Sequence, residues 1–406
     1  MSTSNSQSGI SKTVWILCWI SLLTDIASEM LYPILPLYLS SIGYSFTWIG
    51  FLEGLAEATA GLSKGTFGKL SDVSQKRVPF IRLGYSLSAI SKPMMVLFSN
   101  IGWIFLTRTI DRLGKGIRTG ARDALLSEEA TAKSKGKIFG LHRAMDTLGA
   151  VTGPLLALIA FRYFGLSFAQ LFLIAAIPGI LTIFLSSFLR ESSNPKAAPS
   201  PGGSYKDFII YWKESPPKYK RFALLLWTFS LANSSDLFLL FYVKQVLSSQ
   251  DAMIYVYIFY NLVYAAFSIP AGYLSDSIGP RKILSLGFAL FAVSYGGMAL
   301  GDSIFHFLVL FFLYGIYAAS TEGIAKAWIS NLVPAKDAGT AFGTFSGGQS
   351  ICLLFASIFA GWIWEFVGHP YVFLFSASVS ILIAFLIWTS MRSTEFNIVE
   401  INKGDA

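Results

Sequence analysis

The sequence is poor in charged residues, histidine and cysteine. Asp, Glu, Lys and Arg make up 13% of its 406 residues, and it contains two cysteines and three histidines. Cys18 and Cys352 fall within apolar stretches, so we expect neither a redox pair nor a zinc site. His142, His306 and His369 are far apart, and neither H-E-x-x-H nor G-x-S-x-G occurs. A membrane-embedded enzyme using His142 is therefore a remote alternative, and we expect no metal or cofactor.

Apolar residues dominate instead. They make up 54% of the chain, which has 35 Phe and a mean hydropathy of +0.58. This composition predicts an all-α integral membrane protein, because a helical span needs about 20 mostly apolar residues. The twelve predicted spans are 14–41, 46–70, 79–99, 102–126, 136–163, 167–189, 221–246, 253–275, 282–300, 304–332, 338–366 and 371–391.

The net charge of +8 has a membrane explanation. With twelve spans and both termini in the cytoplasm, the basic residues of the connectors fall mainly on the cytoplasmic side. These are Lys69, Lys76, Arg77, Lys133, Lys135, Lys196, Lys206, Lys213, Lys218, Lys220, Arg281 and Lys336. The opposite connectors hold little more than Arg162 and Lys244. We therefore expect an inner-membrane protein and no nucleic-acid partner.

A proline-rich connector divides the chain. Residues 191–220 contain five prolines and several lysines, and they read as a cytoplasmic linker with a short interfacial helix at 205–212. The predicted domains are residues 1–190, this linker, and residues 221–406. Local repeats relate the two halves: GKLSD at 68–72 recurs as GYLSD at 272–276, and GKIFG at 136–140 recurs as GTAFG at 339–343. A duplicated six-helix unit places a substrate site between the halves near mid-membrane.

With these motifs the chain resembles the major facilitator superfamily of transporters. The loop signature G-x-L-x-D-R-x-G-R-K is partly matched twice, and GAVTGP at 149–154 matches the G-x-x-x-G-P pattern of antiporters. The resemblance implies two six-helix bundles related by a pseudo-two-fold axis, which alternately open to each side of the membrane. The gating residues it implies are Gly68, Asp72, Lys76, Arg77, Arg118, Arg122, Gly272, Asp276 and Arg281, and the antiporter-like motif comprises Gly149, Gly153 and Pro154. We expect Gly68 and Gly272 to end their helices in tight turns.

One span carries an unusual stripe of charge. At helical spacing, its charged side chains share one face: Arg108, Asp111, Arg112, Lys115, Arg118 and Arg122. A charge facing lipid at the bilayer centre costs about 2.5–3.5 kcal/mol, so the stripe must face protein or water. One interpretation is an ion-pair network that holds the first six helices together. The other is that nearby carboxylates exchange protons as Arg112 binds or releases them.

The resemblance to proton-coupled exporters makes Asp25 and Glu29 the first candidates for proton coupling, followed by Glu57 and Asp146. The predicted substrate-binding residues are Glu53, Arg108, Lys115, Arg143, Asn233, Asp236, Tyr257, Tyr260, Asn261, Tyr264 and Gln349.

The leading hypothesis for function is a monomeric secondary transporter that exports a small organic molecule in exchange for protons. The alternative is a proton-coupled importer of an organic anion, because Arg108, Arg112, Lys115 and Arg143 offer partners for carboxylate or phosphate.

Overall fold

The computed structural model describes residues 10–129, 135–191, 205–334 and 338–391, and within these residues every regular element is an α-helix. The helices are α1 (Lys12–Leu31), α2 (Leu35–Ser41), α3 (Phe46–Ser74), α4 (Val78–Met94), α5 (Ile101–Glu129), α6 (Lys135–Phe164), α7 (Phe168–Ser186), α8 (Tyr205–Glu214), α9 (Pro217–Ala232), α10 (Leu237–Leu247), α11 (Gln250–Ile278), α12 (Pro280–Met298), α13 (Ile304–Leu332), α14 (Ala338–Phe366) and α15 (His369–Ser390).

Polar residues and glycine mark the helix ends. Ser11 accepts a hydrogen bond from the backbone of Val14 at the start of α1, and Ser167 and Gln170 form a reciprocal capping box at the start of α7. Gly279 follows α11 with a φ of +98°, a conformation that side chains disfavour. Local chemistry therefore sets most span boundaries close to those expected from the sequence.

The first span of each half is broken, although the sequence predicted continuous helices. Pro33 lies in the break between α1 and α2, where its ring and missing N–H prevent a regular helix. The second break, between α9 and α10, contains Asn233, Ser234, Ser235 and Asp236, whose short polar side chains compete with helical hydrogen bonds. The hydroxyl of Ser376 on α15 donates to the carbonyl of Ala232 at 2.6 Å and so satisfies a carbonyl at the end of α9.

Eight stretches of the described chain are long and apolar enough to cross a membrane. They comprise α1 with α2, α9 with α10, most of α6, α11, α13 and α14, and all of α7 and α15. The helices α3, α4, α5 and α12 complete the twelve spans of the fold. Of these, α3 carries Glu53 and Glu57, and α5 carries the predicted stripe of charge.

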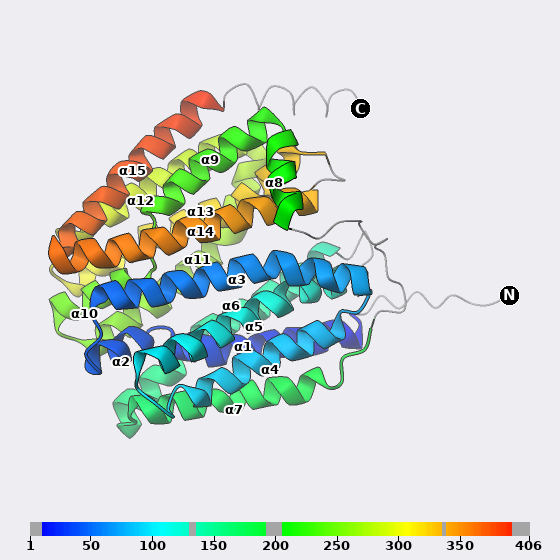
Figure 1. The fold of residues 1–406 in the computed structure, drawn as a ribbon. Helices are drawn as coiled ribbons and strands as arrows, with labels where there is room; N and C mark the ends of the chain where they lie inside the picture. The colour runs from blue at the N-terminus through cyan, green and yellow to red at the C-terminus, as the bar shows by residue number, and fades with distance from the viewer. Residues whose placement is uncertain (1–9, 130–134, 192–204, 335–337, 392–406) are drawn as a thin grey trace.

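The spans form two bundles, α1–α7 and α9–α15, which lie one above the other in Figure 1. They meet chiefly where α3 packs along α14 and α6 packs along α11. Glycine allows the closest approach, since a Cβ at Gly54 on α3 would lie 2.7 Å from the carbonyl oxygen of Leu354 on α14. The interface between the bundles is therefore backbone against backbone at this point.

The halves are joined at the end of the molecule that holds α2 and α10, which we call the α2–α10 end. There the hydroxyl of Thr47 donates to Glu365 at 2.6 Å, and Phe46 contacts Phe241 and Trp364 with ring centroids 4.9 and 5.1 Å apart. The helix α8 lies at the opposite end, which we call the α8 end (Figure 1). The presence of α8 confirms the short helix that the sequence predicted at 205–212.

Gly68 and Gly272 do not end their helices, contrary to the expectation from the sequence. Gly68 lies inside α3, where it faces Gly120 on α5 and permits close packing, and Gly272 lies inside α11. The turns come later, with positive φ at Gln75 and Gly279. A glycine within an apolar stretch is as compatible with helix packing as with termination, and here packing prevails.

Candidate functional site

A cavity of about 520 Å³ lies between the two halves. We call it the central cavity. Its wall includes residues from both helix breaks as well as charged residues from α1, α3, α5 and α6. The residues that line it are Asp25, Glu29, Tyr32, Glu57, Arg112, Lys115, Arg118, Thr119, Arg122, Arg143, Asp146, Thr147, Ala150, Asn233, Ser234, Ser235, Asp236, Tyr257, Tyr260, Asn261, Tyr264, Glu322 and Leu353.

The carboxylates predicted for proton coupling all line this cavity. Asp146 on α6 accepts a hydrogen bond from Ser21 and lies 3.5 Å from the imidazole of His142. Glu29 on α1 accepts a hydrogen bond of 2.5 Å from the hydroxyl of Tyr257 on α11, so it links the first half to the second.

The predicted charge stripe of α5 divides into two groups. Arg112, Lys115, Arg118 and Arg122 line the central cavity, whereas Arg108 does not and instead pairs with Glu53 of α3.

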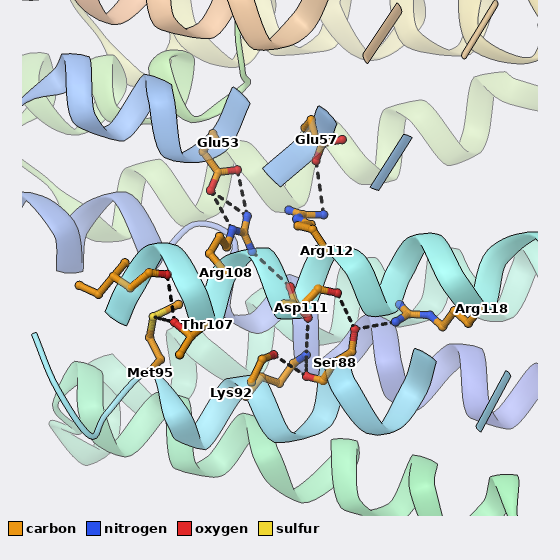
Figure 2. Close-up of polar contacts among 12 residues, drawn as sticks. Glu53, Glu57, Ser88, Lys92, Met95, Thr107, Arg108, Asp111, Arg112 and Arg118 are labelled. Atoms are coloured by element: carbon orange, nitrogen blue, oxygen red, sulfur yellow. Dashed lines mark hydrogen bonds and ion pairs between the residues drawn. The ribbon is translucent and has the colours of Figure 1, made fainter. Parts of the chain in front are cut away.

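Figure 2 shows the buried pair of Arg108 and Glu53, in which two nitrogens of Arg108 donate to the two oxygens of Glu53 at 2.9 Å each. Asp111 lies 3.4 Å from both Arg108 and Lys92 and continues the network toward α4. Glu53 is 1% exposed. Glu53 and Arg108, which were predicted to bind substrate, are not among the residues that line the central cavity.

Among the charged groups that line the central cavity, Arg122 donates to Asp123 at 2.9 Å, whereas Arg112 and Arg118 have looser or neutral partners. Arg112 lies 3.4 Å from Glu57, and its Nε is buried without a hydrogen-bond partner in the described part of the chain. Arg118 donates to Ser88 at 2.7 Å and lies over the ring of Tyr85. The predicted gating residues Arg118 and Arg122 therefore lie in the cavity wall.

Tyrosines form much of the wall that the second half contributes. The rings of Tyr257, Tyr260 and Tyr264 are stacked in sequence along α11, with centroids 6.2 and 6.3 Å apart. Behind them, Tyr314 donates to Asp236 at 2.5 Å. Asn261 donates to the carbonyl of Tyr257 at 3.0 Å. These predicted residues come together as a polar aromatic wall.

Gln349 lies on α14 outside the residues that line the central cavity. Its role in substrate binding stays a prediction from the sequence.

A polar bridge crosses between the halves. Arg143 on α6 donates to the hydroxyl of Tyr264 at 2.6 Å, and this hydroxyl donates to Glu322 on α13 at 2.9 Å. The same three residues also line a second cavity of about 430 Å³, which includes Gly272 and Lys326. Most of the other lining residues follow Tyr264 along α11 and Glu322 along α13, and both helices run toward the α8 end. We call this second cavity the vestibule. The bridge therefore lies between the central cavity and the vestibule.

The repeated loop motif makes contacts within each half. Arg77 lies 3.1 Å from Glu128 and donates to Ser71, and Arg281 donates to the carbonyl of Trp388. The side chains of Asp72 and Asp276 lie outside the described part of the structure, and Lys76 is exposed.

The antiporter-like motif on α6 packs against α1. A Cβ at Gly149 would lie 2.7 Å from the Cβ of Asp25, and one at Gly153 would lie 2.7 Å from the carbonyl oxygen of Ile26. Pro154 is inside α6. The motif thus holds α6 close to the helix that carries Asp25 and Glu29.

The sequence analysis missed eight of the residues that line the central cavity, among them Tyr32, Ser234 and Glu322. Tyr32 and Ser234 lie at the two helix breaks, which the predicted continuous spans concealed. Glu322 lies on α13 four residues before Lys326, a spacing that favours an ion pair within the helix, and for this reason it was not selected. The Asn-Ser-Ser-Asp run at 233–236 was the available signal, since such residues favour helix ends.

Two bundles with broken helices around a polar central cavity are typical of membrane transporters. The family model of the Major Facilitator Superfamily matches residues 17–248 and 222–404. The chain belongs to this superfamily. The family and its relatives are transporters and not enzymes.

Relatives span nearly the whole chain. An uncharacterized MFS-type transporter of Methanocaldococcus jannaschii is 35% identical over 93% of this chain and 94% of its own. The multidrug resistance protein MdtG of Proteus mirabilis is 24% identical, over 94% of this chain and 96% of its own.

Solved structures share the fold at low sequence identity. The nucleoside transporter NupG has a TM-score of 0.79 at 14% identity and covers 93% of this chain and 99% of its own. A bacterial homolog of the lysosomal transporter Spinster, in an inward-facing conformation, has a TM-score of 0.75 at 14% identity, over 95% and 98% of the two chains.

Proposed function

We propose that the protein exports a small organic molecule across the inner membrane in exchange for protons. In this proposal it acts as a monomer, both termini lie in the cytoplasm, and the α8 end faces the cytoplasm. The distribution of basic residues supports this orientation. Efflux is supported by the similarity to MdtG and to the multi-drug resistance efflux pump PmrA homolog of Lactococcus lactis.

The observation that carries proton coupling is the hydrogen bond between Glu29 and Tyr257. It joins the two halves at the wall of the central cavity. A hydrogen bond to an ionised carboxylate is roughly twice as strong as one between neutral groups. Protonation of Glu29 weakens a contact between the halves, and proton release restores it. Proton binding is thereby coupled to the relative movement of the bundles.

Asp25 serves as the second proton site in this mechanism. It lies one helical turn before Glu29, lines the same cavity, and forms no hydrogen bond or ion pair within the described residues. Burying a carboxylate without a partner is costly, so a proton or a ligand cation stabilises it. Asp146 is held by Ser21 and His142, which favours a supporting role.

Transport in energised inside-out vesicles tests this function. Dansylcadaverine and dansylglycine carry the same fluorophore, one with an amine and the other with a carboxylate. We expect a proton gradient to drive uptake of the amine, and we expect Asp25→Asn and Glu29→Gln to abolish this uptake at equal protein levels.

Vesicles without the protein give the background from passive uptake of the amine. Proton-driven movement of dansylglycine in the opposite direction would instead support import of an organic anion. Wild-type rates in both carboxylate variants would show that neither residue carries the coupled proton.

A further inference from the structure

The second half contributes only negative charge to the central cavity. Among the residues that line it, the basic ones all come from α5 and α6: Arg112, Lys115, Arg118, Arg122 and Arg143. The second half provides the carboxylates of Asp236 and Glu322, and each accepts a hydrogen bond from a tyrosine hydroxyl. Within the described residues, Asp236 forms no ion pair. Its half-buried charge at the cavity wall is therefore available to a cationic ligand.

Two more polar groups near Asp236 lack partners. The Oδ1 atom of Asn233 and the Oγ atom of Ser234 are buried without a well-aligned hydrogen bond in the described part of the chain, and the hydroxyl of Tyr295 lies near Ser234. Ser234 is 4% exposed, and both residues line the central cavity at the break between α9 and α10. Unpaired buried polar groups are rare in folded proteins. A ligand that donates hydrogen bonds would satisfy both.

Aromatic rings enclose the same corner of the cavity. The ring of Tyr260 stacks on Tyr314, with centroids 5.2 Å apart, and Tyr314 is the residue that donates to Asp236. Tyr32, from the break in the first half, stacks on Tyr257 with centroids 5.3 Å apart. Aromatic faces attract organic ammonium groups through cation–π interactions.

The residues do not suit a metal cation. No group of three His, Cys, Asp or Glu with the geometry of a metal site occurs among the described residues. A volume of about 520 Å³ is suited to an organic molecule.

We propose that the break between α9 and α10 binds the ammonium group of an organic amine. Asp236 supplies the opposite charge, Asn233 and Ser234 accept hydrogen bonds, and the ring of Tyr260 covers the adjoining apolar part. The basic residues of α5 and α6 repel the ammonium group and direct it toward the second half. This inference rests on the central cavity being the transport site, and it narrows the substrate class to amines.

Ligand-dependent thermal unfolding of the purified full-length protein tests the subsite. Tryptamine and indole-3-propionate share an indole ring and differ in charge. We expect tryptamine to raise the Tm and indole-3-propionate at the same concentration to leave it unchanged. Asp236→Asn keeps the side-chain shape and an acceptor for Tyr314 but removes the charge. We expect it to weaken tryptamine binding by about tenfold or more, because a charge-assisted hydrogen bond is lost.

A second pair of variants tests the aromatic contact without changing charge. Tyr260→Phe keeps the ring and should bind tryptamine as the wild type does, whereas Tyr260→Leu should bind it less tightly. Asp302→Asn is the matched control for the loss of an acid, because its side chain is 84% exposed in the loop before α13. It should leave tryptamine binding unchanged.

The proposal is overturned if indole-3-propionate stabilises the protein more than tryptamine, or if neither raises the Tm at millimolar concentration. Unchanged tryptamine binding in Asp236→Asn would also overturn it. The measurement uses no proton gradient, so its result is independent of the vesicle assay. Failure of proton exchange and failure of the amine subsite are therefore distinguishable.

Discussion

Ion pairs in the first half differ in their surroundings and in how closely their charges approach. Arg108 and Glu53 satisfy each other through two hydrogen bonds of 2.9 Å away from the central cavity. Arg112 and Glu57 lie 3.4 Å apart at the cavity wall, where a ligand or water can reach them. The first pair is suited to holding α5 against α3. The second can change partners during transport.

Removing one member of the Arg108–Glu53 pair should destabilise the protein without altering substrate recognition. Arg108→Met leaves Glu53 buried without a cation, which typically costs about 3–5 kcal/mol. Replacing both residues, as Arg108→Met with Glu53→Leu, removes both charges and should restore most of the stability. Thermal unfolding in detergent measures the change. Transport lost in the double variant despite restored stability would show that the pair has a direct role.

At the scale of helices, small residues set how closely α3 and α14 approach. Gly50, Gly54 and Gly61 on α3 face Ser357, Leu354 and Ser350 on α14. In membranes, helices associate through close packing of such residues, because lipid offers no hydrophobic driving force. This interface joins the two bundles, so its spacing governs how the halves fit together on one side of the central cavity.

A larger side chain at Gly54 should separate these helices. A Cβ there already lies 2.7 Å from the carbonyl oxygen of Leu354 and 2.9 Å from its Cα, so Gly54→Leu cannot be accommodated without moving α3 or α14. We expect transport in proteoliposomes to fall by at least about tenfold, since a small misplacement of a site costs much of its activity.

Gly296→Ala is the matched control on α12, because the nearest atom to an added Cβ is 3.9 Å away. It should transport at the wild-type rate. Normal transport in Gly54→Leu would contradict the view that close contact of α3 with α14 is required.

For the whole molecule, the central cavity is closed at one end by direct contacts between the halves. Thr47, Glu365 and the aromatic cluster around Phe46 hold the α2–α10 end together, while the vestibule beyond the Arg143–Tyr264–Glu322 bridge extends toward the α8 end. Alternating access requires the contacts at the α2–α10 end to break, so that the central cavity opens at that end.

Cross-linking the α2–α10 end should therefore stop transport reversibly. The chain has two native cysteines, so Thr47→Cys with Glu365→Cys can be introduced after replacing Cys18 and Cys352 by serine. A short reducible bifunctional thiol reagent should abolish transport in this variant, and reduction should restore it.

The two single-cysteine variants, treated in the same way, control for modification alone. Continued transport in fully cross-linked protein would mean that this end does not open during the cycle.

Much of the fold was predictable from the sequence because its signals are local. Hydropathy and proline, glycine and serine positions marked nearly all span boundaries, and the repeated motifs at Gly68 and Gly272 indicated the two related halves. For the site, the carboxylates of α1 and the tyrosine row of α11, both selected from the sequence, line the central cavity. Helical spacing alone places such residues on one face.

The sequence by itself determined that this chain inserts in a membrane as helices and that its charges require protein or water around them, because these follow from transfer energies of individual residues. The tertiary structure decided which charges pair. Arg108 and Arg112 lie one turn apart on the same predicted stripe of α5, yet Arg108 pairs with Glu53 outside the central cavity and Arg112 lines the cavity near Glu57. The tertiary structure also decided that residues 233–236 form a break, since Ser376 on α15 satisfies a carbonyl at the end of α9. Such choices depend on contacts between helices, which no local pattern encodes.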